Sequence, residues 1–339
     1  MLKDYLLYQS GLSGSESVRH RAFEIRLSRS RTAQTLKRLG LAPAPARPDG
    51  SPLAAMTAES EQQYCEWYAS RLYSGAGEIV ELGCWLGALT NALAAGLSRN
   101  RSIPEARRRI QVFDYFQWDE VMEVWVANTP FARRVGVGEN YRFLFEECVR
   151  DIAPLVVIHE ADLRHGEWHG GDIEFLSVDA MKSTEITAGI LKTFFGKLIP
   201  GSGYVYHQDY VHFYHGWIHV SLYLLRDYLE LVYEIPDSTA LLFKCKKAIP
   251  PEALAFPATA EAMEEDLIEE AFAWNMKLVK PHLRHAVAAA HTMMYVHRDQ
   301  MPRARELRRR YLAGGYAGSH AFQSMAEFTA WLKPVDWDE

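Results

Sequence analysis

The chain has 339 residues, of which 48% are hydrophobic and 24% charged, as is usual for a soluble globular protein of two or three domains. Its net charge of −6 argues against a large nucleic-acid-binding surface, which needs an excess of basic side chains. The beginning of the sequence lacks the features of a signal peptide, and no apolar run reaches the ~18 residues of a membrane span. We therefore expect a cytoplasmic protein with neither a nucleic-acid nor a membrane partner.

The four cysteines, Cys65, Cys84, Cys148 and Cys245, lie far apart in the sequence. None belongs to a C-x-x-C pair, so their spacing indicates neither a zinc site nor a disulfide framework. We expect four reduced thiols, which agrees with a cytoplasmic location.

Residues 1–75 are predicted to form an N-terminal helical arm or cap. Residues 1–40 read as polar, arginine-rich helix, and the four prolines of 41–52 then exclude a regular helix and indicate a linker. A further helix is predicted for 57–74, where Glu59 and Glu61 give an acidic first turn.

From Gly77 the pattern changes to short apolar strands that alternate with helices. The strands are predicted at 78–82, 110–114, 155–161, 173–179, 203–209, 231–235 and 240–246, and the helices at 87–99, 118–127, 140–152, 184–197 and 212–229. Such strands are typical of a parallel sheet covered on both faces. Only 236–239 separates the last two strands, so the final strand should be antiparallel. The predicted fold class of residues 76–248 is α/β, with a doubly wound, seven-stranded, mostly parallel sheet of Rossmann-like type.

A proline-rich boundary follows Lys247, and residues 249–339 then read as a helical extension. This extension suits either a lid or a dimer interface, and we expect a homodimer.

The stretch EIVELGCWLG places Glu81 at the end of the first strand and Gly83 and Gly87 in the turn after it. A strand, a glycine turn and a helix form the unit that cradles nucleotide-like ligands, because glycine lets the backbone approach closely. The spacing departs from the dinucleotide motif G-x-G-x-x-G, which weighs against nicotinamide-dependent redox chemistry. Tight packing is the alternative explanation of both glycines.

Asp114 ends the second strand, about thirty residues after the glycine turn. An acidic residue at this position can accept hydrogen bonds from both hydroxyls of a ribose. Aspartate is also favoured as a helix N-cap, and the two roles are compatible.

These segments resemble class I S-adenosylmethionine-dependent methyltransferases, and most of all the macrocin O-methyltransferase family, which methylates hydroxyls of sugars and other secondary metabolites. ELGCWLG is similar to the family's E-x-G-x-x-x-G turn, and DYFQW to its DSFEG-like strand end. SVDAMKST resembles D-x-D-L-Y-x-S-T, and LIPGSGYVYHQDY resembles L-x-P-G-G-x-x-x-x-D-D-Y. The resemblance covers residues 76–247, about half of the chain.

The resemblance implies that the cofactor is S-adenosyl-L-methionine. Glu81 would then face its amino group, and Gly83 and Gly87 would admit its amino-acid and ribose parts. Asp114 would bind the ribose hydroxyls, and Asp162, after the third strand, would contact the adenine. A loop-capping role is the alternative for Asp162.

Many relatives use a divalent metal, held by carboxylates, to orient and acidify the acceptor hydroxyl. The corresponding positions are Ser177, Gln208 and Asp209, only one of which is a carboxylate, so the resemblance implies a weak or absent metal site. A shifted register would add Asp179, which makes Asp179 and Asp209 weak metal candidates.

The catalytic candidates are Asp179, His207 and Asp209. Asp179 is the first choice for a general base or a substrate anchor, because it ends the fourth strand, where open α/β sheets bind ligands. His207 is the second, because an imidazole suits proton transfer near pH 7, although strand alternation could also turn it into the sheet.

The segment HQDYVHFYHGWIHVSLY is dense in histidine and aromatic residues. His212, His215 and His219 are predicted to lie near one helical face, where a metal site is less common than pocket lining. Tyr210, His212, His215 and Trp217 are predicted to form the wall of a pocket for a small-molecule acceptor. Core packing is the alternative for the aromatic side chains.

The preferred function is O-methyl transfer from S-adenosylmethionine to a hydroxyl of a sugar or secondary metabolite. N-methylation of an amino sugar or other amine is one alternative, because it needs less base assistance and agrees with the missing metal ligands. A repurposed fold that transfers no methyl group is another, although the intact glycine turn and Asp114 speak against complete loss of cofactor binding.

Overall fold

The computed structural model describes residues 55–331 apart from Asn128, together with 19–21, 23–24, 27, 335 and 337. Most of the predicted N-terminal helical region and all of 41–52 therefore lie outside the described residues. Two compact units interleave along the chain, one containing 84–160 and 232–238 and the other containing 77–83, 161–231 and the residues after 238. The predicted boundaries at 75/76 and 248/249 stay predictions.

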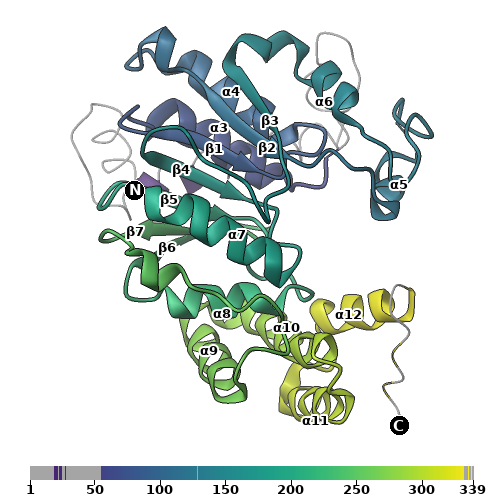
Figure 1. The fold of residues 1–339 in the computed structure, drawn as a ribbon. Coiled ribbons are helices and arrows are strands. Elements are labelled where there is room, and N and C mark those ends of the chain that lie inside the picture. Colours follow the sequence, from purple (N-terminus) through teal and green to yellow (C-terminus); the bar gives the residue numbers. More distant parts are fainter. Residues whose placement is uncertain are drawn as a thin grey trace. The chain divides into compact units, whose positions relative to one another are not determined.

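Seven strands form one hydrogen-bonded sheet in the order β3-β2-β1-β4-β5-β7-β6 (Figure 1). They are β1 (Glu78–Leu82), β2 (Ile110–Asp114), β3 (Val156–Glu160), β4 (Ile173–Val178), β5 (Tyr204–His207), β6 (Leu229–Glu234) and β7 (Leu241–Cys245). The pairs β2–β3, β1–β4 and β4–β5 are parallel, and β7 is antiparallel to β5. The predicted α/β class, the seven-stranded mostly parallel sheet and the antiparallel last strand are confirmed.

The order of the strands reverses between β1 and β4, since the chain continues from β1 to β2 and β3 but from β4 to β5. In the register of these two strands Glu81 lies opposite Ser177, and the N–H of Asp179 donates to the Leu82 carbonyl at 2.9 Å. All six residues of β4 are buried, as its apolar sequence requires. Open α/β sheets bind ligands beyond the carboxyl ends of the strands at such a reversal.

In the first unit, helices α3 (Glu59–Arg71) and α4 (Ala88–Arg99) pack against each other, followed by α5 (Glu120–Val126) and α6 (Arg142–Cys148). The predicted helix start near Glu59 is confirmed, and the Glu61 carboxylate accepts the Ala58 N–H at 3.1 Å. The predicted continuous helix over 140–152 is wrong. A 3₁₀ segment, Arg150–Leu155, follows α6 and contains Pro154, which cannot continue an α-helix.

In the second unit, α7 (Thr184–Phe194) begins after Ser183, whose Oγ accepts the Ile186 N–H at 3.2 Å. The helices α8 (Gly216–Leu224), α9 (Glu265–Leu278), α10 (Arg284–His297), α11 (Met301–Tyr311) and α12 (His320–Trp331) follow. The almost fully buried α10 packs against the other four (Figure 1). Within the described part of the chain, no helix has both the length and the apolar character needed to cross a lipid bilayer.

The predicted helix over 212–229 is too long, because α8 covers only Gly216–Leu224. The N–H of Val211 donates to the Thr239 carbonyl at 3.1 Å, and the N–H of His212 donates to the Asp209 carbonyl at 3.0 Å. These hydrogen bonds hold the segment before α8 in a turn. His212 and His215 therefore precede the helix, and the predicted helical face of three histidines is wrong.

Candidate functional site

The carboxylate of Asp114 organises the turn after β1. Its Oδ2 accepts hydrogen bonds from the backbone N–H groups of Cys84 (2.9 Å) and Trp85 (3.2 Å). Its Oδ1 accepts from the Phe116 N–H (2.7 Å) and from the Tyr141 hydroxyl (3.0 Å). A carboxylate has about four acceptor positions, so these donors fill it. The Cys84 thiol also lies 3.6 Å from Oδ2, which leaves Tyr141 as the one hydroxyl among these donors. A ribose hydroxyl could bind Asp114 by replacing the Tyr141 hydroxyl.

The alternative role of Asp114 as a helix N-cap is wrong. The N-cap of α5 is Asp119, whose Oδ1 accepts the Val121 N–H at 3.0 Å. Asp114 instead bonds the turn after β1 to the turn after β2. The predicted contact of Asp114 with a ribose stays a prediction.

Gly83 and Gly87 both have left-handed backbone conformations, with φ of +83° and +79°. A Cβ on Gly83 would lie 3.1 Å from the carbonyl carbon of Asp179, and one on Gly87 would lie 2.8 Å from the Val149 side chain. The sign of φ and the close packing both demand glycine here. Both glycines thus have a structural reason of their own, beside the predicted approach of a ligand.

Trp85 lies in the same turn with two unusual properties. Its φ is +44°, a strained conformation for a bulky residue. Its indole Nε1 is buried and has no hydrogen-bond partner in the described part of the chain. Buried N–H groups are normally paired, so this donor fits a ligand that offers an acceptor oxygen next to the Asp114 turn.

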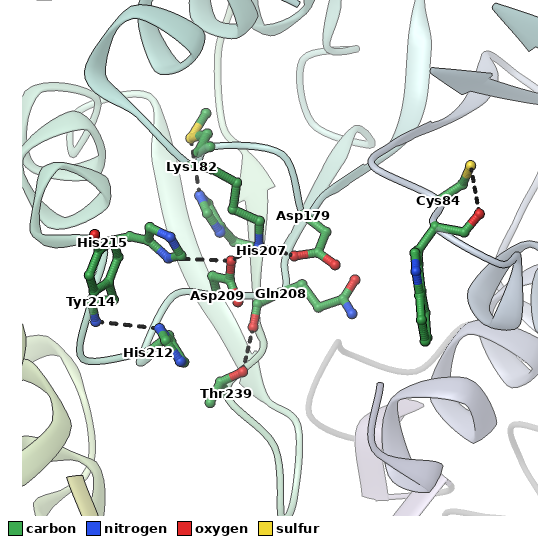
Figure 2. Close-up of polar contacts among 12 residues, drawn as sticks. Cys84, Asp179, Lys182, His207, Gln208, Asp209, His212, Tyr214, His215 and Thr239 are labelled. Carbon is green, nitrogen blue, oxygen red and sulfur yellow. Dashed lines mark hydrogen bonds and ion pairs between the residues drawn. The ribbon is translucent and has the colours of Figure 1, made fainter. Parts of the chain in front are cut away.

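A second polar cluster lies at the carboxyl ends of β4 and β5 (Figure 2). The ammonium of Lys182 contacts Asp179 Oδ1 at 2.7 Å and also pairs with Asp209 Oδ2. The Nδ1 atom of His215 lies 3.4 Å from the same oxygen of Asp209. The Lys182, Asp179 and Asp209 side chains are 48%, 25% and 16% exposed, so a ligand can reach them. We call Asp179, Lys182 and Asp209 the lysine clamp.

Neighbouring hydrogen bonds hold the backbone of the lysine clamp. The indole N–H of Trp217 donates to the Met181 carbonyl at 2.8 Å, and the hydroxyl of Thr239 donates to the Gln208 carbonyl at 2.8 Å. Each fixes the residue immediately before a clamp residue. The clamp is therefore preorganised, as a site that acts on a reacting group must be.

The three charges of the clamp change one another's pKa values. Burial raises the pKa of Asp179 to about 7, and the Asp209 carboxylate adds to this increase while the Lys182 ammonium opposes it. Burial also raises the pKa of Asp209, but Lys182 outweighs it and the net pKa lies well below the usual range. Burial lowers the pKa of Lys182, but the two carboxylates outweigh it and the net pKa is raised. Lys182 is therefore charged, and Asp179 can exchange a proton near neutral pH.

The reason for choosing His207 as a base is wrong. Its side chain is fully buried, and its Nε2 lies 3.4 Å from the sulfur of Met181. Burial lowers the pKa of His207 to about 3, far from the value that suits proton transfer near pH 7. The strand turns this imidazole into the packing of the sheet, as the alternative interpretation had it.

Tyr210 and Trp217 are buried side chains with structural hydrogen bonds. Tyr210 is fully buried, and its hydroxyl donates to the Asn275 Oδ1 atom on α9. Trp217 is 5% exposed and holds the Met181 carbonyl. The burial and hydrogen bonds of both side chains agree better with core packing, the alternative interpretation, than with the predicted pocket wall.

His212 and His215 lie between Asp209 and α8, and each lies close to an aromatic neighbour. The His212 ring stacks on Phe213 at 4.6 Å between centroids, and the His215 ring lies 5.4 Å from that of His212. Burial lowers the pKa of His215 well below its usual value, although the Asp209 carboxylate opposes this. A neutral His215 beside Asp209 can therefore accept or donate a hydrogen bond to an acceptor molecule.

The structure places the two remaining predicted residues in different surroundings. Glu81 is 1% exposed within β1, where it lies in register with Ser177 of β4. Asp162, after β3, pairs with the Arg164 guanidinium at 2.9 Å, and this hydrogen bond lowers the pKa of Asp162. The loop-capping alternative for Asp162 is also present, since its Oδ1 accepts the Arg164 N–H at 3.0 Å. Their predicted cofactor contacts stay predictions.

The side chains at the family's metal positions do not fit a divalent cation. Among the described residues, no three histidine, cysteine, aspartate or glutamate side chains converge as a metal site would require. The Ser177 hydroxyl is buried without a hydrogen-bond partner in the described chain, and the ammonium of Lys182 lies between the two candidate carboxylates. A magnesium ion would need several oxygen ligands where this ammonium lies.

The sequence interpretation missed Lys182, which lies inside the segment SVDAMKST that supported the resemblance. A basic residue immediately before a helix N-cap is disfavoured by the helix dipole, and this unusual position could have singled out Lys182 in the sequence.

No protein-family model matches the sequence, and no curated protein matches it.

Proposed function

We propose that the protein is an S-adenosylmethionine-dependent O-methyltransferase that acts on a hydroxyl of a small sugar-containing or secondary metabolite. The observation that carries this proposal is the lysine clamp, an acid–base group at the carboxyl ends of β4 and β5 beside the reversal of strand order. The resemblance of four ordered sequence segments supports it. The seven-stranded, mostly parallel sheet is compatible with it.

Bound S-adenosylmethionine would supply a methyl group on a sulfonium, an electrophile that an oxygen nucleophile attacks in line. The protein must then align the acceptor hydroxyl and remove its proton, and alignment alone contributes on the order of 7–11 kcal/mol in favourable cases. In this proposal Asp179 takes the proton of the hydroxyl. The new bond joins oxygen to the methyl carbon, and the electron pair of the broken carbon–sulfur bond remains on sulfur.

The turn after β1 contributes the cofactor contacts in this proposal. The Trp85 indole N–H is the open donor, and Asp114 becomes an acceptor for a ribose hydroxyl when the Tyr141 hydroxyl rotates away. The backbone N–H groups of Cys84 and Trp85 keep the carboxylate of Asp114 in place throughout.

The test uses purified protein, S-adenosylmethionine with an isotope-labelled methyl group, and a panel of acceptors that carry sugar hydroxyls, phenols or amines. Mass spectrometry should find the label on an oxygen. Asp179→Asn should lower turnover by at least about 100-fold, because the amide cannot take the proton. The control is Asp172→Asn, an exposed aspartate that precedes β4 at its other end, and it should keep full turnover.

Two results would change the proposal. Label found only on the amines would assign N-methylation, and full turnover of Asp179→Asn would remove Asp179 as the base.

A further inference from the structure

The positive charge of Lys182 lies at a helix N-terminus, where it does not stabilise the helix. It immediately precedes Ser183, the N-cap of the 11-residue helix α7. The N-terminus of a helix carries a partial positive charge, so a lysine is disfavoured there. A positive charge at this position therefore needs another source of stabilisation, and the clamp carboxylates of Asp179 and Asp209 provide it.

The ammonium joins two carboxylates that come from different strand ends. An ammonium has three N–H groups, and Lys182 directs one to Asp179 and one to Asp209. Its third N–H has no partner among the described residues. A side chain that bridges two acids and keeps one open donor can hold a ligand oxygen, as an open position on a metal does.

His215 gives a second, independent indication of a ligand at the clamp. The residue is 8% exposed, and its Nδ1 atom makes no hydrogen bond in the described chain. This atom points toward Asp209, 3.4 Å from its Oδ2 (Figure 2). A buried polar atom that faces a charged group without making a hydrogen bond to it is typical of a site that a ligand completes.

We propose that Lys182 is a built-in cation that takes the place of a divalent metal between Asp179 and Asp209 and offers its third N–H to the acceptor oxygen. The part concerning the acceptor rests on the proposed function. The part concerning the cation rests only on the clamp, where the ammonium already neutralises the charges that would attract a metal.

The experiment compares Mn²⁺ binding to the wild type and to Lys182→Met, which keeps an unbranched side chain one atom shorter and removes its charge. Free Mn²⁺ is measured by electron paramagnetic resonance, with no methyl donor or acceptor present. Lys182→Met leaves two carboxylates facing an open position, so it should bind one Mn²⁺ per chain at least about tenfold more tightly than the wild type. The double variant Lys182→Met/Asp209→Asn should lose this gain.

A thermal melt of each variant shows whether it is folded and gives a second readout. Added Mn²⁺ should raise the melting temperature of Lys182→Met but not that of the wild type, because only a bound ligand stabilises the folded state. Equal Mn²⁺ affinity in the two proteins, whether both bind or neither does, would overturn the proposal.

Turnover tests the part concerning the acceptor. Lys182→Met should be at least about 100-fold slower than the wild type, and Mn²⁺ should restore part of the loss in this variant alone. Unchanged turnover in Lys182→Met would overturn that part. The Mn²⁺ binding result does not depend on methyl transfer, so failure of the built-in cation and failure of the proposed function are distinguishable.

Discussion

At the residue scale, Asp114 is the side chain that the turn after β1 most depends on. Its two oxygens accept from three backbone N–H groups, from one hydroxyl and from the Cys84 thiol. An asparagine in its place would keep one acceptor oxygen and turn an NH₂ group toward donors that it cannot satisfy. The neutral amide would also lose the stronger hydrogen bonds that a charged acceptor makes.

We expect Asp114→Asn to lower the free energy of unfolding by about 2 kcal/mol, because hydrogen bonds to charged groups contribute about that much. Chemical denaturation measures this change. The matched control is Asp119→Asn, the same substitution at the N-cap of α5, where asparagine caps as well as aspartate. An equal loss in the two variants would show that Asp114 has no special role in the turn.

Single residues could be predicted from the sequence where a strand end fixes their position. Asp114 and Asp179 were found because each follows an apolar run that ends at a recognisable place. Lys182 was not, because its ion pair with Asp209 joins residues 27 positions apart in the chain. His207 was misjudged, since the sequence does not show how far burial lowers an imidazole pKa.

At the element scale, one buried side-chain pair joins the segment before α8 to α9. The Tyr210 hydroxyl donates to Asn275 Oδ1, and the Asn275 amide donates to the His219 carbonyl at 3.0 Å and the Ala271 carbonyl at 2.7 Å. Removing the hydroxyl would leave the Asn275 oxygen buried without this donor. A buried acceptor that loses its partner costs about 1–3 kcal/mol.

Tyr210→Phe should therefore lower the free energy of unfolding by about 1–3 kcal/mol in a denaturant titration. The matched control is Tyr223→Phe, whose hydroxyl donates to the Glu270 carboxylate in an exposed position at 2.8 Å. That variant should change stability by less than about 0.5 kcal/mol, because the Glu270 carboxylate can bond to water instead. Equal effects would contradict the structural role of Tyr210.

His219 on α8 makes the stability of this region depend on pH. Its side chain is fully buried between Tyr210 and Phe272, and burial lowers its pKa from the usual 6.5 to about 4. Between these values the unfolded chain binds more protons than the folded chain, so stability is complete above pH 6.5 and falls as the pH decreases. From about pH 7.5 to about pH 5 this one group should lower the free energy of unfolding by about 2 kcal/mol.

The measurement is the free energy of unfolding of the wild type and of His219→Gln at both pH values. The variant should lose about 2 kcal/mol less than the wild type over this range, because it no longer carries the titrating group. His169→Gln, which removes an exposed imidazole instead, is the control. Identical pH dependence in the wild type and His219→Gln would contradict this account.

Helices and strands could be predicted from the sequence where the local pattern of apolar residues and the tertiary contacts favour the same structure. All seven strands were predicted within two residues, because each is a short apolar run between turns. The helix over 212–229 was predicted too long, because its first part is held in a turn by the bond from Val211 to Thr239. That bond closes a separation of 28 residues, which no periodicity within the segment reveals.

At the scale of the whole molecule, the large exposed apolar side chains of the described chain all come from one stretch. They are Tyr115, Val124, Trp125, Val137 and Phe143, on α5, on the start of α6 and in adjoining loops. Exposed apolar side chains gathered in one stretch are typical of an interaction surface. If the chain forms the homodimer proposed above, we propose that this stretch, and not only the C-terminal extension, contributes to its contact.

Sedimentation velocity tests this expectation. The wild type should sediment at twice the mass of the chain, and Trp125→Glu should shift it toward the monomer, because a charge in an apolar contact is costly. The control is Glu120→Gln, an exposed polar change on the same helix, which should leave the mass unchanged. A monomeric wild type would contradict the homodimer.

A calorimetric titration of the purified protein with S-adenosylmethionine and with its demethylated product tests the methyltransferase proposal without any acceptor. We predict saturable binding of both at about one site per chain, with micromolar affinity that EDTA and added magnesium leave unchanged. Asp114→Ala should abolish this binding, because it removes the acceptor of the ribose hydroxyls. Absence of binding to both molecules by the folded wild-type protein would contradict the methyltransferase proposal and favour a repurposed fold.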